Sequence, residues 1–206
     1  MPTLTGIKET KQGRLALFLD GEFAFSLDET TFAGADLHTD DELEDWRVEE
    51  LRKASDTRKA LDRAMDCLAL RDHAAGELYQ KLCRKFDPHS AAWAVARAQE
   101  LGLLDDAAFA RHRAAELYRK RKSRREILRD LAGKGIDRDV AAEAVETLYA
   151  EHEEDGEDPE IATARVLVER RYASKLAAGK RDNVAAALAR RGFSHAVIRA
   201  VLEEYE

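Results

Sequence analysis

The sequence has few of the features that mark a membrane, secreted or metal-binding protein. It contains two cysteines, with no Cys-x-x-Cys pair and no histidine at ligand spacing beside either. A disulfide between Cys67 and Cys83 is compatible with the sequence, but reduced apolar residues in two helices are the better interpretation. No apolar run reaches the roughly 18 residues of a membrane span, and the first residues lack the apolar core of a signal peptide. We therefore expect a cytoplasmic protein that does not bind membranes.

Candidates for catalysis are equally scarce. The six histidines are scattered and form no i, i+4 pair. The adjacent carboxylates Asp105 and Asp106 have no histidine, glutamate or nucleophile at a useful spacing. We expect no catalytic residue, no metal site and no cofactor, and therefore a protein that is not an enzyme.

Aromatic residues make up only 7% of the chain, whereas charged residues make up 36%. Much of the chain must therefore be solvated surface around narrow aliphatic stripes, as in amphipathic helices. The net charge of −7 argues against a general binder of polyanions, but the charge is unevenly distributed. Residues 20–50 carry twelve acids and one base, whereas residues 111–138 carry eleven bases and four acids. A local basic surface is thus compatible with the acidic total.

The most informative feature that is present is a helical segment that occurs three times. The second copy, residues 123–148, and the third, residues 180–205, align without a gap at an offset of 57 residues, which places Gly135 on Gly192. The first copy, residues 77–101, fits with one gap, because Phe86 follows Lys85 directly where the other copies insert glycine. Self-similarity of this kind indicates a repeat architecture.

Apolar residues spaced i, i+3, i+4 predict three helices in each repeat. We expect a mainly α fold of three tandem three-helix repeats forming an elongated molecule, with a small N-terminal β-hairpin appendage. The expected divisions are 1–55 for the hairpin segment and an acidic linking helix, 56–104 for repeat one, 105–155 for repeat two and 156–206 for repeat three. The expected helices are 57–71, 74–85, 90–101, 106–119, 124–133, 138–150, 159–172, 181–190 and 195–205.

Turn residues support the N-terminal part of this scheme. The dipeptide Asp20-Gly21, between strand-like runs, predicts a two-residue hairpin turn, and residues 4–9 are a candidate third strand. Thr39 and Glu42 have the spacing of a capping box, which predicts that the acidic linking helix begins there.

Local residues also predict where the helices of the repeats begin and end. Gly135 and Gly192 each follow a helix-terminal cation, so we expect the left-handed conformation that ends a helix. An Asp of the pair 105–106 is expected to cap the helix that follows it. The acidic run 151–160 is expected to be a solvated linker between repeats two and three.

Several of these residues form a pattern that resembles a known family. The run Gly102-Leu103-Leu104-Asp105-Asp106, followed by Phe109-Ala110, Ile127, Leu131 and Lys134-Gly135-Ile136, resembles the signature of the RecX proteins, which modulate the bacterial recombinase RecA. Residues 19–27 (LDGEFAFSL) resemble the N-terminal hairpin of that family. The chain departs from the pattern where no glycine separates Lys85 from Phe86, at Ala74, where the family often has Ser, and at Ser123, where it often has Gly.

The resemblance implies three tandem three-helix repeats forming an elongated curved molecule, and no catalytic residue. It implies binding along or within the groove of the RecA filament, with restraint of ATP hydrolysis and strand exchange, and so a role in recombinational DNA repair and the SOS response. The implied partner is the RecA filament, with single- or double-stranded DNA as a further candidate, and the protein is expected to be a monomer.

The sequence supplies a candidate interface for such a partner. Six of the seven residues 119–125 are basic, at the expected junction of two helices, where like charges repel unless an anionic partner neutralises them. A second concentration, which includes Arg165, lies in the third repeat, and a solvated polar face is the alternative interpretation of both. The candidate partner- or DNA-binding residues are Arg119, Lys120, Arg121, Lys122, Arg124, Arg125, Arg129, Lys134, Arg170, Arg171, Lys175, Lys180, Arg181, Arg190 and Arg191.

Two other functions are compatible with the sequence. A three-helix unit with a basic second helix resembles helix-turn-helix geometry, so an autonomous DNA-binding protein is the main alternative, and a scaffold without a nucleic-acid role is another. The acidic net charge argues against autonomous DNA binding. Tyr118, which adjoins the basic cluster, is the aromatic residue best placed to stack on a base.

Overall fold

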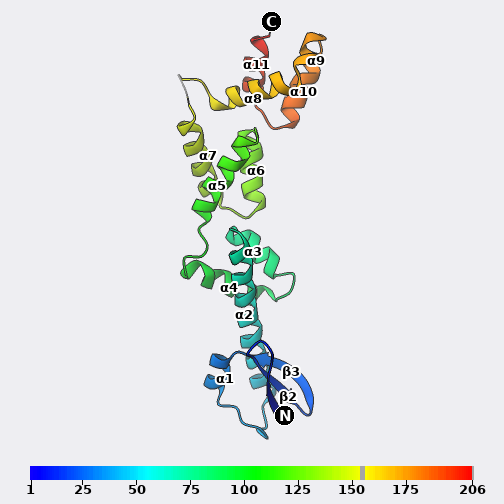
Figure 1. Cartoon of the computed structure of the whole chain (residues 1–206), viewed down its shortest axis with the longest axis vertical. Helices are drawn as coiled ribbons and strands as arrows, with labels where there is room; N and C mark the ends of the chain where they lie inside the picture. Colours follow the sequence, from blue (N-terminus) through cyan, green and yellow to red (C-terminus); the bar gives the residue numbers. More distant parts are fainter. Residues whose placement is uncertain (154–155, 206) are drawn as a thin grey trace. The chain divides into compact units, whose positions relative to one another are not determined.

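The computed structural model describes residues 1–153 and 156–205. These residues form eleven helices and one three-stranded antiparallel sheet (Figure 1), which confirms the mainly α fold with an N-terminal β element. The chain divides into two compact units. The first comprises Met1–His73 and Leu78–Leu104, and the second comprises Ala74–Glu77 and Asp105–Glu206.

The N-terminal sheet is built around the predicted hairpin. Its strands are β1 (Leu4–Glu9), β2 (Leu15–Leu19) and β3 (Glu22–Leu27), in the order β1-β2-β3. Asp20 and Gly21 have φ angles of 49° and 84°, which confirms the two-residue turn. Leu4, Leu17 and Leu27 are fully buried. The candidate third strand is thus part of the sheet.

Two helices follow the sheet, α1 (Glu29–Ala35) and α2 (Asp45–Leu70). We did not predict α1, and α2 is one continuous helix where we expected a linking helix and a separate first helix of repeat one. The predicted capping box is wrong, because α2 begins at Asp45 and Glu42 instead forms a β-bridge with Thr3. Residues 40–43 run beside β1, where Leu43 is buried, so they are not available to start a helix.

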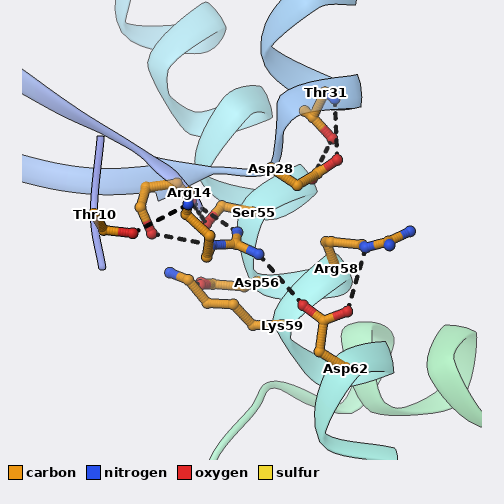
Figure 2. Close-up of polar contacts among 10 residues, drawn as sticks. Thr10, Arg14, Asp28, Thr31, Ser55, Asp56, Arg58, Lys59 and Asp62 are labelled. Carbon is orange, nitrogen blue, oxygen red and sulfur yellow. Dashed lines mark hydrogen bonds and ion pairs between the residues drawn. The ribbon is translucent and has the colours of Figure 1, made fainter. Parts of the chain in front are cut away.

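A polar network holds the sheet on α2 (Figure 2). The guanidinium of Arg14 donates to the Ser26 carbonyl at 2.9 Å and pairs with Asp62 at 3.4 Å. Ser55, which is completely buried, donates to the same carbonyl at 2.6 Å. Asp62 also pairs with Arg58, one turn earlier in α2. These bonds satisfy the buried polar groups where the sheet meets the helix.

The repeats are formed by the remaining helices. Those of repeat one are α3 (Ala75–Leu82) and α4 (Pro88–Glu100), which follow α2; repeat two has α5 (Asp106–Arg119), α6 (Arg124–Gly133) and α7 (Arg138–Glu151); repeat three has α8 (Pro159–Arg171), α9 (Ala173–Ala177), α10 (Arg181–Arg190) and α11 (His195–Glu203). The short helix α9 was not predicted. Equivalent core positions are buried in repeats two and three, as at Ile127 and Val184 and at Leu131 and Leu188.

The glycine predictions are confirmed. Gly135 and Gly192 have φ angles of 78° and 88°, in the left-handed region that glycine reaches without strain. The predicted linker 151–160 includes residues 154–155, which lie outside the described residues. The prediction is wrong at both ends of the run: Glu151 is the last residue of α7, and Pro159 and Glu160 form the start of α8, where both are buried.

Candidate partner interface

The basic cluster, residues 119–125, forms the end of α5, a tight turn and the start of α6. The turn is fixed by backbone bonds from Arg121 to Tyr118 and from Lys122 to Leu117, at 2.8 and 3.1 Å. Arg121 has a φ angle of 58°, which is costly for a residue with a side chain. Ser123 then caps α6 by accepting the Glu126 N–H at 3.2 Å.

Three cations of the cluster are engaged within repeat two. Lys120 pairs with Glu116 at 2.5 Å and Lys122 with Glu126 at 2.9 Å. Hydrogen bonds from Lys120, and then from Arg113, lower the pKa of Glu116 to about 2. The Arg124 guanidinium lies 4.4 Å from the centre of the Tyr149 ring, a cation–π contact.

The other arginines of this region face solvent without such partners. Among residues 1–153 and 156–205, no carboxylate pairs with Arg119, Arg121, Arg125 or Arg129. Arg125 and Arg129 are exposed and one turn apart on α6, where like charges repel. We call these four residues the open arginines. They concentrate unneutralised positive charge at the end of α5, on the turn and along α6.

The candidate residues of repeat three occupy helix ends. Arg170 and Arg171 lie in the last turn of α8, Lys175 lies in α9 at 5.6 Å from the Tyr172 ring, and Lys180 is the N-cap of α10. Arg181, Arg190 and Arg191 are the first residue, the last residue and the C-cap of α10. Arg165 has a structural role instead, because it pairs with Glu204 at 2.6 Å and with Glu157.

The start of α6 contacts the turn that follows α10. The Ser123 hydroxyl donates to the Arg191 carbonyl at 2.7 Å. A Cβ atom on Gly192 would lie 2.8 Å from the Ser123 Oγ and 3.4 Å from the Arg125 Cβ. The backbone of the two basic concentrations, around residues 123–125 and 190–191, is therefore brought together within the second unit.

A buried carboxylate also contacts the start of α6. We call the contact between the start of α6 and the residues of repeat three a junction. Glu160, of which 7% is exposed, accepts the backbone N–H of Arg124 at 2.9 Å, so it caps α6 from another repeat. Burial raises the pKa of Glu160. Burial likewise raises the pKa of Tyr149, whose hydroxyl has no hydrogen-bond partner among the residues that the structure describes. Sequence reasoning missed Glu160, although its place beside Pro159 in a first helical turn marked it as a residue near a helix start.

A second junction in the same unit joins the start of α3 to repeat two, again through a carboxylate and a glycine. Asp106 accepts the backbone N–H of Ala75 at 2.8 Å, while Asp105 caps its own helix α5 by accepting the Ala108 N–H. The Cα atoms of Gly76 and Gly135 approach so closely that a Cβ on either would lie 2.8 Å from the other. Lys134, a candidate binding residue, pairs here with Glu77 at 3.0 Å.

Tyr118 is not available to stack on a base. Only 9% of it is exposed, and its ring lies 5.5 Å from that of Tyr149 and 4.6 Å from that of His152. The prediction that it contributes to base stacking is therefore wrong, because the core of repeat two takes up its ring.

The described residues form no recognisable metal-binding, membrane-spanning or disulfide-linked site. No group of three His, Cys, Asp or Glu residues there is placed to hold a metal ion. In the same part of the chain, no helix is long and apolar enough to cross a membrane. Cys67 and Cys83 are free thiols.

Comparison with known sequences gives one consistent family. The family model described as "RecX, second three-helix domain" matches residues 105–145. The chain is 28% identical to the regulatory protein RecX of Bacillus subtilis, over 100% of this chain and 78% of that protein. It is 31% identical to the regulatory protein RecX of Lactobacillus gasseri, over 82% of this chain and 62% of that protein.

Solved structures show the same fold. A crystal structure of regulatory protein RecX matches with a TM-score of 0.71 at 20% identity, covering 98% of this chain and 100% of that one. RecX from Lactobacillus salivarius matches with a TM-score of 0.60 at 22% identity, covering 74% of this chain and 97% of that one. The sequence similarity and the fold agree: over nearly its whole length, this chain is similar to the RecX regulatory proteins.

Proposed function

We propose that this chain is a non-enzymatic regulator that binds the RecA recombinase filament and inhibits its ATPase and strand-exchange activities, thereby modulating recombinational DNA repair. The observation that supports the proposal most directly is the set of open arginines on a chain similar to the RecX regulatory proteins. Four guanidinium groups on the end of α5, the turn and α6, without a carboxylate partner among the described residues, repel one another in the free protein. An anionic partner would remove that repulsion.

A filament offers a repeat protein several equivalent contact points. Each contact is weak, but linked contacts add through their high effective concentration. The anionic groups of a recombinase filament are the acidic side chains of its protomers and the phosphates of its DNA. Each phosphate contact with single-stranded DNA would add about 0.7 to the salt dependence of binding, so titration at several salt concentrations separates the two sources.

The test is the single-stranded-DNA-dependent ATPase activity of RecA in the presence of the purified chain. We expect that activity to fall at near-stoichiometric or lower amounts, in reactions where co-sedimentation shows the chain on the filament. Full ATPase activity with the chain bound to the filament would contradict the proposal.

Autonomous DNA binding is less well supported. In helix-turn-helix proteins the N-terminal residues of the second helix contact base edges. The corresponding end of α6 is packed against the turn at Arg191 and Gly192 and is capped by Glu160. Tight, sequence-dependent binding to naked duplex DNA would favour this alternative.

A further inference from the structure

A pocket of about 380 Å³ lies beside the junction at the start of α6. The start of α6, the end of α7 and the start of α8 enclose it, all within the second unit. Its volume is at the lower end of the range of ligand sites in proteins. One wall is formed by Glu146, Tyr149, Ala150 and Glu153. Their spacing of i, i+3, i+4, i+7 places them on a single face of α7 and of the turn that follows it.

Tyr149 brings a polar group without a partner to this pocket. Only 3% of Tyr149 is exposed, and its hydroxyl has no hydrogen-bond partner in the described part of the chain. Buried polar atoms of this kind cost free energy and are rare in native proteins. The ring is held by the Arg124 guanidinium at 4.4 Å and by the edge of Tyr118 at 5.5 Å. The hydroxyl is therefore fixed in position for a group that enters the pocket.

The charged groups of the pocket are mostly acidic. The exposed carboxylates of Glu146, Glu153 and Asp158 line it, and Arg124 is the one cation among its described lining residues. Glu146 and Glu153 make no ion pair with a described residue. Glu153 also lies beyond the C-cap of α7, where the helix dipole disfavours negative charge. We call this site the acidic pocket.

The carboxylates of the acidic pocket are not arranged for a metal ion. No group of three His, Cys, Asp or Glu among residues 1–153 and 156–205 is placed to hold one. An organic cation fits the charge and the separation of these groups better, because it spreads several N–H donors over a larger volume.

We infer that the acidic pocket binds a basic side chain, lysine or arginine, of a partner protein. The ammonium or guanidinium group has enough N–H donors to bond the Tyr149 hydroxyl and two carboxylates together. Its charge also removes the repulsion among those carboxylates. Nucleic acid offers phosphates and no such cation, so the occupant is a protein. Under the proposed function that protein is the recombinase, so the identity of the partner rests on that function.

The experiment replaces Glu146 and Glu153 together by glutamine in the full chain. Both residues are exposed, so the fold is expected to be kept, as circular dichroism would verify. The matched control replaces Glu143 and Glu151, two exposed acids of α7 that do not line the acidic pocket, so the change in charge is the same. Tyr149→Phe removes the hydroxyl alone. Affinity is measured by fluorescence anisotropy on RecA filaments assembled on labelled oligo-dT.

We expect the pocket double variant and Tyr149→Phe each to bind the filament about tenfold more weakly than the control double variant. Tyr149→Phe should also raise the free energy of unfolding, because it removes a buried hydroxyl that has no described partner. Its weaker binding would therefore not result from unfolding. Equal affinity of the two double variants would overturn the inference, and so would Tyr149→Phe with the affinity of the wild type. Self-association of the wild-type chain that the pocket double variant abolishes would overturn it too, since the occupant would then be a second copy.

A measurement without recombinase keeps the inference separate from the proposed function. A tetralysine peptide should raise the unfolding temperature of the wild type and of the control double variant more than that of the pocket double variant, because it binds the folded state. The same shift in all three proteins would overturn the inference. Failure of the wild-type chain to bind the filament, with the peptide effect present, would overturn the proposed function alone.

Discussion

At Arg121 the backbone adopts a conformation that lowers the stability of the fold. A left-handed conformation costs a residue with a side chain roughly 1–2 kcal/mol, whereas glycine in its place costs roughly 0.5–1 kcal/mol of extra chain entropy. The backbone bonds on either side hold the turn in this conformation. Backbone strain kept at a half-buried cation that has no carboxylate partner among the described residues is typical of a functional position.

We therefore expect Arg121→Gly to raise the free energy of unfolding of the second unit by about 0.5–1 kcal/mol while weakening binding to the filament. Urea denaturation followed by circular dichroism measures the first effect. Tryptophan emission reports on the first unit separately, because Trp46 and Trp93 both lie in it. Arg121→Gly with lower stability and unchanged affinity would show that the arginine serves the turn alone.

At Gly135 the lack of a side chain matters for two reasons, its positive φ angle and its close contact with Gly76. Its φ angle resembles that of Gly179, at 72°, but a Cβ on Gly179 would meet nothing within 4 Å. Gly179→Ala therefore measures backbone strain, whereas Gly135→Ala measures strain plus collision with the backbone of Gly76. We expect Gly135→Ala to lower the free energy of unfolding of the second unit by on the order of 1 kcal/mol more than Gly179→Ala. Equal losses would mean that the Gly76 contact relaxes at no cost.

At the scale of helices, the junctions depend on carboxylates supplied from other repeats. Glu160 is buried and caps α6, and its raised pKa means that the folded protein disfavours its charged form. The unfolded chain has a glutamate pKa of about 4.3. Between that pH and the higher pKa of the folded state, Glu160 is ionised in the unfolded chain but still protonated in the folded protein. As pH rises through this range, the free energy of unfolding that Glu160 contributes therefore falls, and it stops falling once the pH exceeds the folded pKa.

Glu160→Gln keeps an oxygen that accepts the Arg124 N–H but carries no charge. We expect its stability relative to the wild type to increase as pH rises from about 4 to 8. Glu160→Ala removes the acceptor and should cost about 0.5–2 kcal/mol, the range for loss of a helix cap. Urea denaturation at a series of pH values measures both. If the free energies of unfolding of Glu160→Gln and the wild type differed by the same amount at every pH, ionisation of buried Glu160 would not affect stability, and the prediction would be wrong.

Most helix boundaries of repeats two and three could be predicted because their signals are local. Ser123 and Asp105 cap the helices that follow them, Pro159 lies in a first turn, and the two glycines end helices. Local signals failed at α2, where Thr39 and Glu42 have the right spacing but residues 40–43 bind to the sheet. They also failed at α1, whose only cap is Asp28.

The candidate interface could be predicted in composition but not in arrangement. The sequence identifies six cations in residues 119–125, but it does not show that Lys120, Lys122 and Arg124 are held by Glu116, Glu126 and Tyr149. Contacts one helical turn apart could have been inferred from spacing. The Arg124–Tyr149 contact and the Glu160 cap join distant segments, and no local pattern encodes them.

At the scale of the whole molecule, some charged side chains stabilise the fold through ion pairs, and others are left for a partner. Arg113, for example, binds both oxygens of Asp130 at 2.8 and 2.9 Å and lowers the pKa of that carboxyl group. Arg165 does the same with Glu204. The open arginines make no such bond to any described carboxylate, so their replacement should change binding more than stability.

The most direct measurement of this claim compares two triple variants with the same change in charge. One replaces Arg121, Arg125 and Arg129 by glutamate, and the other replaces Lys11, Arg84 and Lys85, which lie in the first unit and whose side chains make no described ion pair. The readout is inhibition of the single-stranded-DNA-dependent ATPase of RecA. We expect the first variant to require at least about ten times more protein than the wild type for half-inhibition, and the second to inhibit as the wild type does. Equal inhibition by both variants would contradict the account.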